Sequence, residues 1–144
     1  MHVSVIHGPN LNLLGKREPQ IYGHATLAAI DEQIQQTARL LDLSVTIAQY
    51  NAEGAIIDAI HSAASQAEAL IINPGAYSHY SHAIADAIAA VGIPTLEVHL
   101  SNIASREGFR RLSVTAPVCV GSIAGFGAQS YLLALHAAAA LISS

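Results

Sequence analysis

The sequence alternates short apolar runs with longer segments in which apolar residues recur at helical spacing, and this alternation constrains the fold more than any other feature. One run, Val3–Ile6, ends at Gly8-Pro9, and another, Ala69–Asn73, ends at Pro74-Gly75. Short apolar runs between turn residues are typical of buried strands. The predicted strands are Val3–Ile6, Ser44–Tyr50, Ala69–Asn73, Pro94–His99 and Pro117–Ser122.

Helical spacing is found in the segments between these runs. Thr26 is suited to cap the first helix, because a threonine side chain can accept a hydrogen bond from the first turn. Its apolar face consists of Leu27, Ile30, Ile34, Ala38 and Leu41. The other predicted helices are a segment lined by Ile57, Ile60 and Ala64, then Ser81–Val91 and Ala128–Leu141.

Five strands separated by helices imply a parallel sheet with helices on both faces and right-handed connections. We predict a single domain, 1–144, of the α/β class: a flavodoxin-like, doubly wound sheet with strand order 2-1-3-4-5. Ligands of such sheets bind beyond the carboxyl ends of the strands, near the point where the strand order reverses. Functional residues are therefore expected directly after the first, third and fourth strands.

The chain is apolar, with 52% hydrophobic and only 11% charged residues. Its alanine-rich stretches, Ala83–Val91 and Ala134–Ile142, are shorter than the about 20 apolar residues of a membrane span. We therefore expect no membrane association and a surface that is buried in a homo-oligomer. The first residues do not resemble a signal peptide, and the single Cys119 allows no intrachain disulfide, which favours the cytoplasm. The net charge of −4 argues against nucleic-acid binding.

Five of the six lysines and arginines fall in two short segments. Lys16 and Arg17 belong to the first segment, and Arg106, Arg110 and Arg111 belong to the second. Scattered, solvated charges are the alternative interpretation. Two clusters in a chain with so few charges favour an anion-binding site.

The segment after the first strand, residues 8–23, greatly exceeds the about 2–6 residues of an ordinary βα loop. It has neither the spacing of a P-loop nor GxGxxG, so a phosphate cradle is disfavoured. Loops of this length are commonly active-site lids or disordered segments. After the third strand, Asn73 is placed to project an amide into the crevice, and capping of its own turn is the less favoured alternative. For His79, a site role and a solvated side chain stay equally open.

The fourth strand carries a carboxylate and an imidazole on one face. Glu97 and His99 are two residues apart, which places them about 6–7 Å apart at Cα and within hydrogen-bonding reach. Buried parallel strands are normally apolar throughout, so this pair is costly unless it has a use. The carboxylate would orient the ring and favour its protonated form, making His99 a general acid, although a satisfied polar pair at the strand end is the alternative. Ser101 follows with a hydroxyl.

Tyr22 is the natural partner base. A phenol is a weak base at neutral pH, but a nearby guanidinium such as Arg17 would stabilise the phenolate. Spacing alone does not establish that pairing. His79 and His82 form only a weak match to metal-ligand spacing, so no metal is predicted, and Cys119 in its apolar setting is interpreted as core packing.

Four segments, His7–Gly23, Asn73–His79, Glu97–Asn102 and Phe109-Arg110, resemble the signatures of the type II 3-dehydroquinate dehydratases. The resemblance covers almost the whole chain, and the combination of GPNLNLLGKREPQIYG with EVHLSN is highly specific. It implies a flavodoxin-like fold, an enzyme of the shikimate pathway without a cofactor, and a dodecamer built from trimers. The implied reaction converts 3-dehydroquinate to 3-dehydroshikimate and water.

The resemblance also implies roles for individual residues. Tyr22 would take the proton next to the ketone, Arg17 would activate Tyr22, and Asn10 would help hold the enolate through a water. His99, oriented by Glu97, would protonate the departing hydroxyl. The implied substrate-binding set is Asn73, His79, Ser101, Arg110, the backbone at Leu100, and Asp86 from a neighbouring subunit.

Some positions depart from the family's common pattern. His7 stands where Asn is usual, Tyr50–Gly54 replaces SNHEG, Ala85 replaces a frequent Arg, and Ile103 replaces a frequent Pro. None of these positions carries a proton in the implied mechanism, so the departures concern oligomer contacts and loop packing.

The chief alternative is a non-enzymatic flavodoxin-like module that binds a nucleotide or flavin or receives a phosphoryl group. A receiver needs an acidic pair after the first strand and an aspartate after the third, whereas this chain has His7-Gly8 and Asn73 there. A flavin-bound protein would absorb visible light, and the chain has no Trp to stack on the flavin. A scaffold that has lost activity is disfavoured because every expected catalytic position is filled.

Overall fold

The computed structural model describes residues 1–16, 18–22 and 24–144. These residues form a five-stranded parallel sheet in the order β2-β1-β3-β4-β5, so the predicted strand order is confirmed. The order reverses between β1 and β3, which places the expected ligand site at the carboxyl ends of these strands. The strands are β1 (His2–His7), β2 (Ser44–Gln49), β3 (Ala69–Asn73), β4 (Thr95–His99) and β5 (Gly121–Ala124).

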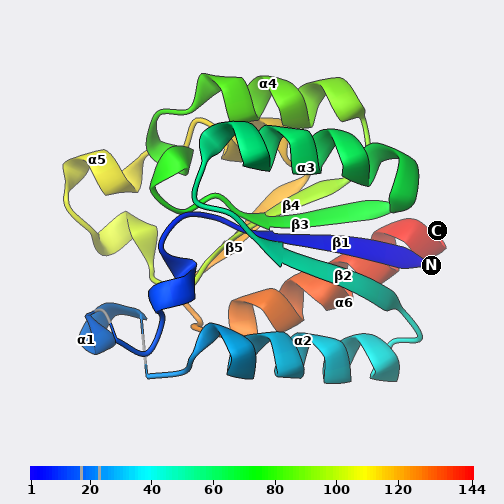
Figure 1. Cartoon of the computed structure of the whole chain (residues 1–144), viewed down its shortest axis with the longest axis horizontal. Coiled ribbons are helices and arrows are strands. Elements are labelled where there is room, and N and C mark those ends of the chain that lie inside the picture. Colours follow the sequence, from blue (N-terminus) through cyan, green and yellow to red (C-terminus); the bar gives the residue numbers. More distant parts are fainter. Residues whose placement is uncertain (17, 23) are drawn as a thin grey trace.

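Helices cover both faces of the sheet, as predicted (Figure 1). One face is covered by α3 (Glu53–Gln66) and α4 (His82–Val91), and the other by α2 (Leu27–Leu40) and α6 (Gln129–Ser143). The shorter elements are α1 (Pro19–Tyr22), α5 (Gly108–Arg111), and the 3-10 turns η1 (Leu11–Leu13), η2 (Gly75–His79), η3 (Ile103–Ser105) and η4 (Ala116–Val118). In the described part of the chain, no helix combines the length and apolar character needed to cross a membrane.

Each face of the sheet has its own apolar core, because successive side chains of a strand point to opposite faces. Val5 and Ile71 pack in the cluster that includes Ile34 of α2 and Leu135 of α6. On the other face, the cluster consists of Ile6, Leu70 and Ile72 with Ile56 and Ile60 of α3 and Ile84 and Ile88 of α4. Full burial of a side chain of this size contributes about 1.5–3 kcal/mol. Packing in these two clusters fixes the strands, and therefore their carboxyl ends, relative to one another.

The predicted helix start at Thr26 is correct: its Oγ1 accepts a hydrogen bond from the Ala29 N–H at 3.2 Å. The predicted fifth strand at Pro117–Ser122 is misplaced, because β5 begins only at Gly121. Pro117 instead lies in η4, since a proline has no N–H for a strand ladder but fits the first turn of a helix. The apolar run that resembled a strand is therefore mostly a connection into β5.

Candidate active site

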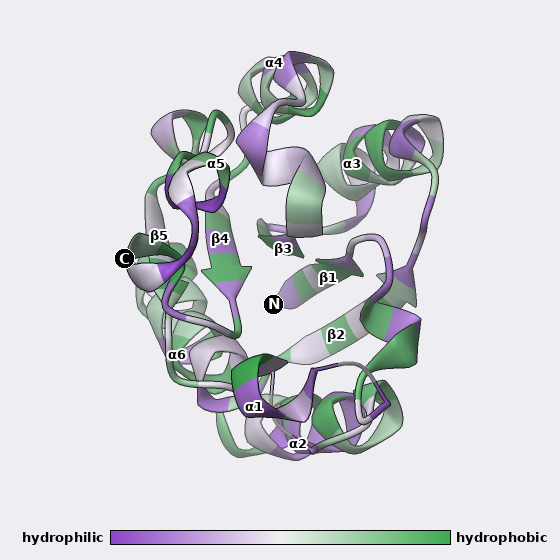
Figure 2. Cartoon of the chain, turned by 90° about the vertical axis from the view of Figure 1, so that its left-hand side faces the viewer, coloured by the Kyte–Doolittle hydropathy of each residue, from purple (hydrophilic) through white to green (hydrophobic). Residues whose placement is uncertain are grey.

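A pocket of about 110 Å³ lies at the carboxyl ends of β1, β3 and β4, where functional residues were expected. Figure 2 views the molecule from this end, with α1 and α5 beside the strand ends. The predicted site residues that line the pocket are Asn10, Tyr22, Asn73, His79, His99, Leu100, Ser101 and Arg110. Ile103 and Arg106 line it as well. Segments far apart in the sequence therefore supply one cavity.

The floor of the pocket depends on a close approach between the ends of β1 and β3. The Gly8 N–H donates to the Asn73 carbonyl at 2.7 Å, and a Cβ at Gly8 would lie only 2.7 Å from Asn73 and Pro74 backbone atoms. Gly75 has a φ of +60°, a conformation that favours glycine, and a Cβ there would lie 3.1 Å from Pro9. These two glycines allow the Asn10 segment to lie against Asn73.

His99 and Glu97 form the hydrogen-bonded pair that the strand pattern predicted. His99 Nε2 lies 2.8 Å from Glu97 Oε2, and both side chains are buried. Behind the pair, Ser113 Oγ donates to Glu97 Oε2 at 2.7 Å, and Thr115 Oγ1 donates to Oε1. Glu97 does not line the pocket itself, so it acts on the pocket through His99.

The environment of Glu97 favours its charged form. Burial acts to raise the pKa of Glu97, but the hydrogen bond and charge of His99, together with the hydroxyls of Thr115 and Ser113, outweigh burial and lower the pKa. An ionised carboxylate only accepts hydrogen bonds, so His99 must donate through Nε2–H. Nδ1 is then the ring nitrogen that remains for proton exchange with a bound molecule.

Tyr22 lies beside the guanidinium of Arg106. Arg106 Nη1 donates to the Tyr22 hydroxyl at 3.3 Å, and its guanidinium carbon lies 5.4 Å from the centre of the Tyr22 ring. The same Nη1 donates to Ser101 Oγ at 3.2 Å. Sequence reasoning placed Arg106 in a cation cluster but missed this contact, for which the only signal was its position shortly after Ser101.

His79 and Arg110 also line the pocket. His79 Nδ1 lies 2.7 Å from the Leu112 carbonyl, which can only accept, so neutral His79 carries its proton on Nδ1. Its Nε2 is then an acceptor. Arg110 Nε donates to Glu107 Oε1 at 2.5 Å. The pKa of Glu107 is lowered, first by a hydrogen bond from its own backbone and then by Arg110.

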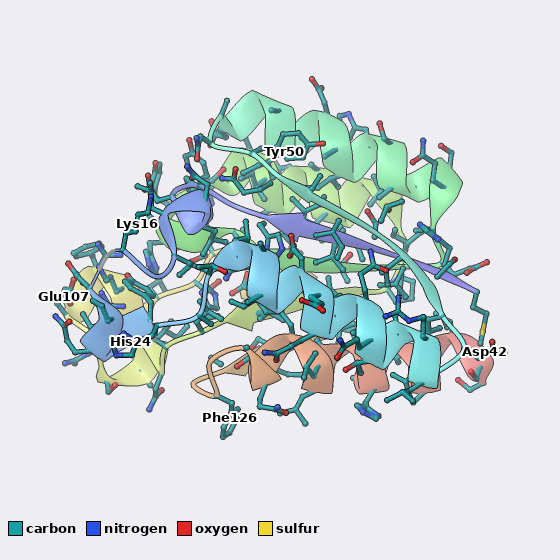
Figure 3. All side chains as sticks on the ribbon, turned by 60° about the horizontal axis from the view of Figure 1, so that its bottom comes forward. Lys16, His24, Asp42, Tyr50, Glu107 and Phe126 are labelled. Carbon is teal, nitrogen blue, oxygen red and sulfur yellow. The ribbon has the colours of Figure 1, made fainter. Side chains whose placement is uncertain are left out.

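Lys16, from the first cation cluster, lies at the same end of the molecule as the segment that holds the second cluster. In Figure 3, Lys16 and Glu107 are labelled there together with His24, whereas Asp42 lies at the opposite end. Arg106 and Arg110 both line the pocket. This arrangement suits an anionic ligand.

Besides Glu97, two further predicted site residues are not among those that line the pocket, for different reasons. Arg17 lies outside the described residues. Asp86 is exposed on α4 and does not line the pocket of its own chain, so its expected place in a neighbour's site stays a prediction.

Neither a nucleophilic thiol nor a metal cluster is evident near the site. Burial, and next the charge of Glu97, raises the pKa of the half-buried Cys119 thiol to about 12, so the thiol stays protonated at neutral pH. Among residues 1–16, 18–22 and 24–144, no group of three or more His, Cys, Asp or Glu side chains is placed to hold a metal ion.

Comparison with known proteins gives one consistent result. The profile of the family described as dehydroquinase class II matches residues 1–139. The 3-dehydroquinate dehydratase of Pelotomaculum thermopropionicum is 55% identical, covering 98% of both chains. That of Caldanaerobacter subterraneus subsp. tengcongensis is 57% identical, covering 94% of this chain and 91% of the relative. The crystal structure of a type II dehydroquinase from Butyrivibrio crossotus superimposes with a TM-score of 0.94 at 46% identity, covering 96% and 97% of the two chains.

Proposed function

This chain belongs to the dehydroquinase class II family, and we propose that it dehydrates 3-dehydroquinate to 3-dehydroshikimate with Tyr22 as the base and His99 as the acid. The observation that carries this assignment is the pairing of each side chain with its own charged neighbour at one pocket. Arg106 is hydrogen-bonded to Tyr22, and Glu97 is hydrogen-bonded to His99. A positively charged neighbour suits a base and a negatively charged neighbour suits an acid, so one cavity can hold both.

Tyr22 removes the proton from the carbon between the ketone and the hydroxyl-bearing carbon. The C–H electron pair moves onto the ketone oxygen and forms an enolate. Arg106 supports the phenolate form of Tyr22 because a guanidinium stabilises an adjacent negative charge. In this proposal Arg17 adds a second positive charge to Tyr22, and Asn10 helps to hold the enolate through a water.

His99 completes the elimination. The enolate re-forms the ketone, the carbon–carbon double bond forms, and the carbon–oxygen bond breaks as His99 gives its proton to the departing hydroxyl. The products are one enone and one water. Glu97 favours the charged ring and holds Nε2, so Nδ1 delivers the proton.

The remaining lining residues bind the substrate. Arg110 and the backbone at Leu100 and Ser101 suit its carboxylate, and Asn73 and His79 suit its hydroxyls. Residues 1–144 act as one catalytic domain. Asp86 from a neighbouring subunit completes the site in a cytoplasmic dodecamer of trimers, and no cofactor takes part.

The test is an ultraviolet assay for enone formation from 3-dehydroquinate, with protein treated with a chelator. Absorbance rises if the proposal is correct, and a flat trace from folded protein overturns it. A positioned acid or base contributes about 10²–10⁴-fold, so Tyr22→Phe and His99→Ala should each reduce kcat at least 100-fold while folding normally. Near-normal turnover by Tyr22→Phe would mean that the base is another group.

The arginines provide a further check on these roles. Arg17→Ala should act mainly on kcat, since Arg17 is assigned to the base. Arg110→Ala should act more on KM, since Arg110 is assigned to binding. The reverse result would exchange the roles of the two cation clusters.

A further inference from the structure

A chain of buried polar groups lies beneath the pocket and ends at Asn73. It runs from Asp31 on α2 through His7 at the end of β1 and Tyr131 on α6 to the Asn73 amide. His7 and Tyr131 are almost completely buried, and their rings meet edge to face at 5.0 Å. The mechanism above uses none of the first three residues. Buried polar groups need partners, so the direction of each hydrogen bond in the chain is informative.

The donor and acceptor of each hydrogen bond can be assigned by starting from Asn73. The Gly75 N–H donates to Asn73 at 3.1 Å, so the atom that it meets must be the carbonyl oxygen, Oδ1. The NH₂ group of Asn73 therefore faces Tyr131 and donates to the phenol oxygen at 3.1 Å. This fixes one orientation of the amide.

The directions of the other hydrogen bonds follow from the Tyr131 hydroxyl. Burial raises the pKa of Tyr131; the hydrogen bond from Asn73 acts against burial, and the charge of Asp31 adds to it, so the phenol keeps its proton. The O–H donates to His7 Nδ1, 2.7 Å away. His7 then carries its own proton on Nε2 and donates to Asp31 Oδ1 at 2.7 Å.

At the pocket end of these hydrogen bonds, Asn73 offers a hydrogen-bond donor. Asn73 uses Oδ1 for Gly75 and one N–H for Tyr131, and its side chain lines the pocket. The second N–H is the group that the amide retains for a ligand. Turning the amide over would set its NH₂ against the Gly75 N–H and lose that bond, and Tyr131 could then donate to Oδ1 only by giving up its bond to His7.

We propose that Tyr131, oriented by His7 and Asp31, is a positioning residue that holds the Asn73 amide with an N–H directed to a hydroxyl oxygen of the substrate. This inference rests on the proposed function, because it assigns a binding role to Asn73. The competing explanation is that these bonds only join β1, β3 and α6. A positioning role differs from a structural one because its effect on binding requires Asn73.

Tyr131→Phe removes the phenol oxygen with little change in shape. Loss of one positioned hydrogen bond corresponds to a KM increase of about three- to tenfold, with kcat within about twofold of the parent. The decisive comparison adds Asn73→Ala. If Tyr131 acts through Asn73, the double variant should have the KM of Asn73→Ala alone, because the amide to be positioned is gone.

Ser130→Ala is the matched control. Ser130 is also buried, is adjacent to Tyr131 on α6, and uses its hydroxyl to accept from the Phe126 N–H at 3.1 Å, away from Asn73. It should lower the unfolding midpoint and leave KM unchanged. Three results would each overturn the positioning role. These are a KM increase in Ser130→Ala equal to that in Tyr131→Phe, independent effects of Tyr131→Phe and Asn73→Ala on KM, and an unchanged KM in Tyr131→Phe.

Asp31→Ala provides a second route if Tyr131→Phe does not fold. Asp31 is partly exposed, so water can replace its carboxylate. A KM increase that is absent in an Asn73→Ala background supports the proposal, and an increase that persists in that background, or an unchanged KM, contradicts it. An inactive wild-type enzyme would instead contradict the proposed function. Crystal structures would then decide the positioning role, since an unmoved Asn73 amide in Tyr131→Phe or Asp31→Ala overturns it and a turned amide supports it.

Discussion

At the scale of single residues, the charge of Glu97 is the feature on which His99 depends most directly. Glu97→Gln preserves size and keeps an oxygen for the His99 N–H, and Thr115 can rotate its hydroxyl to accept from the new NH₂. The neutral side chain no longer favours the protonated ring. We expect kcat to fall at least about tenfold, as part of the 10²–10⁴-fold that a positioned acid contributes. Steady-state kinetics in the enone assay measure this, and an unchanged kcat would show that only the shape of Glu97 matters.

Glu97 also makes stability depend on pH. Its pKa is lowered in the folded protein, so it contributes stability above the value of an unfolded glutamate, about 4.3. That contribution is lost as the pH falls through the lower, folded value. The stability advantage of wild type over Glu97→Gln should therefore shrink as the pH is lowered from neutral to below about 4. Urea denaturation of both proteins across this range tests it, and an advantage that grows with acidity would reverse the sign.

At the scale of elements, the junction of β1 and β3 limits what the pocket tolerates. A Cβ on Gly8 would overlap backbone atoms of Asn73 and Pro74 at 2.7 Å, and backbone cannot move aside as a side chain can. We expect Gly8→Ala to cost about 1–3 kcal/mol of unfolding free energy and to reduce activity, because the strand ends that carry Asn10 and Asn73 must separate. Chemical denaturation and the enone assay measure the two effects.

The control for this junction is Gly54→Ala. Gly54 lies in α3, and a Cβ there meets no atom within 4 Å. Alanine is favoured over glycine in helices, so this variant should be neutral or more stable by up to about 1 kcal/mol, with normal activity. Equal losses in both variants would mean that the close approach at Gly8 has no special role.

The same junction shows how far sequence patterns can reach. Strand order and the meeting of segments after β1, β3 and β4 were predictable, because parallel sheets place carboxyl ends at one edge. The Glu97–His99 bond was predictable too, since strand periodicity fixes neighbours two residues apart. The contact between Arg106 and Tyr22 was not, because it joins residues 84 positions apart through the packing of two short elements. The buried bond between His7 and Tyr131, 124 positions apart, left no local pattern either.

At the scale of the whole molecule, the chain has an exposed apolar surface and an acidic residue assigned to a neighbour's site. Exposed large side chains include Phe109, Leu112, Val120 and Phe126. We propose that further copies of the chain cover these side chains in the assembly. In the proposed assembly, Asp86 of one subunit faces the pocket of the next, so each active site combines Tyr22 from one chain with Asp86 from another.

Mixed assemblies test this shared site. Tyr22→Phe and Asp86→Ala subunits, each weakly active alone, are co-expressed with different tags and the hybrids are purified. If Asp86 acts across an interface, a site is intact when its Tyr22 comes from an Asp86→Ala subunit and its Asp86 comes from a Tyr22→Phe neighbour. Random mixing of equal amounts makes about a quarter of the sites intact, so activity should rise to about a quarter of wild type. If Asp86 acts within its own chain, no hybrid site has both residues, and activity stays at the level of the single variants.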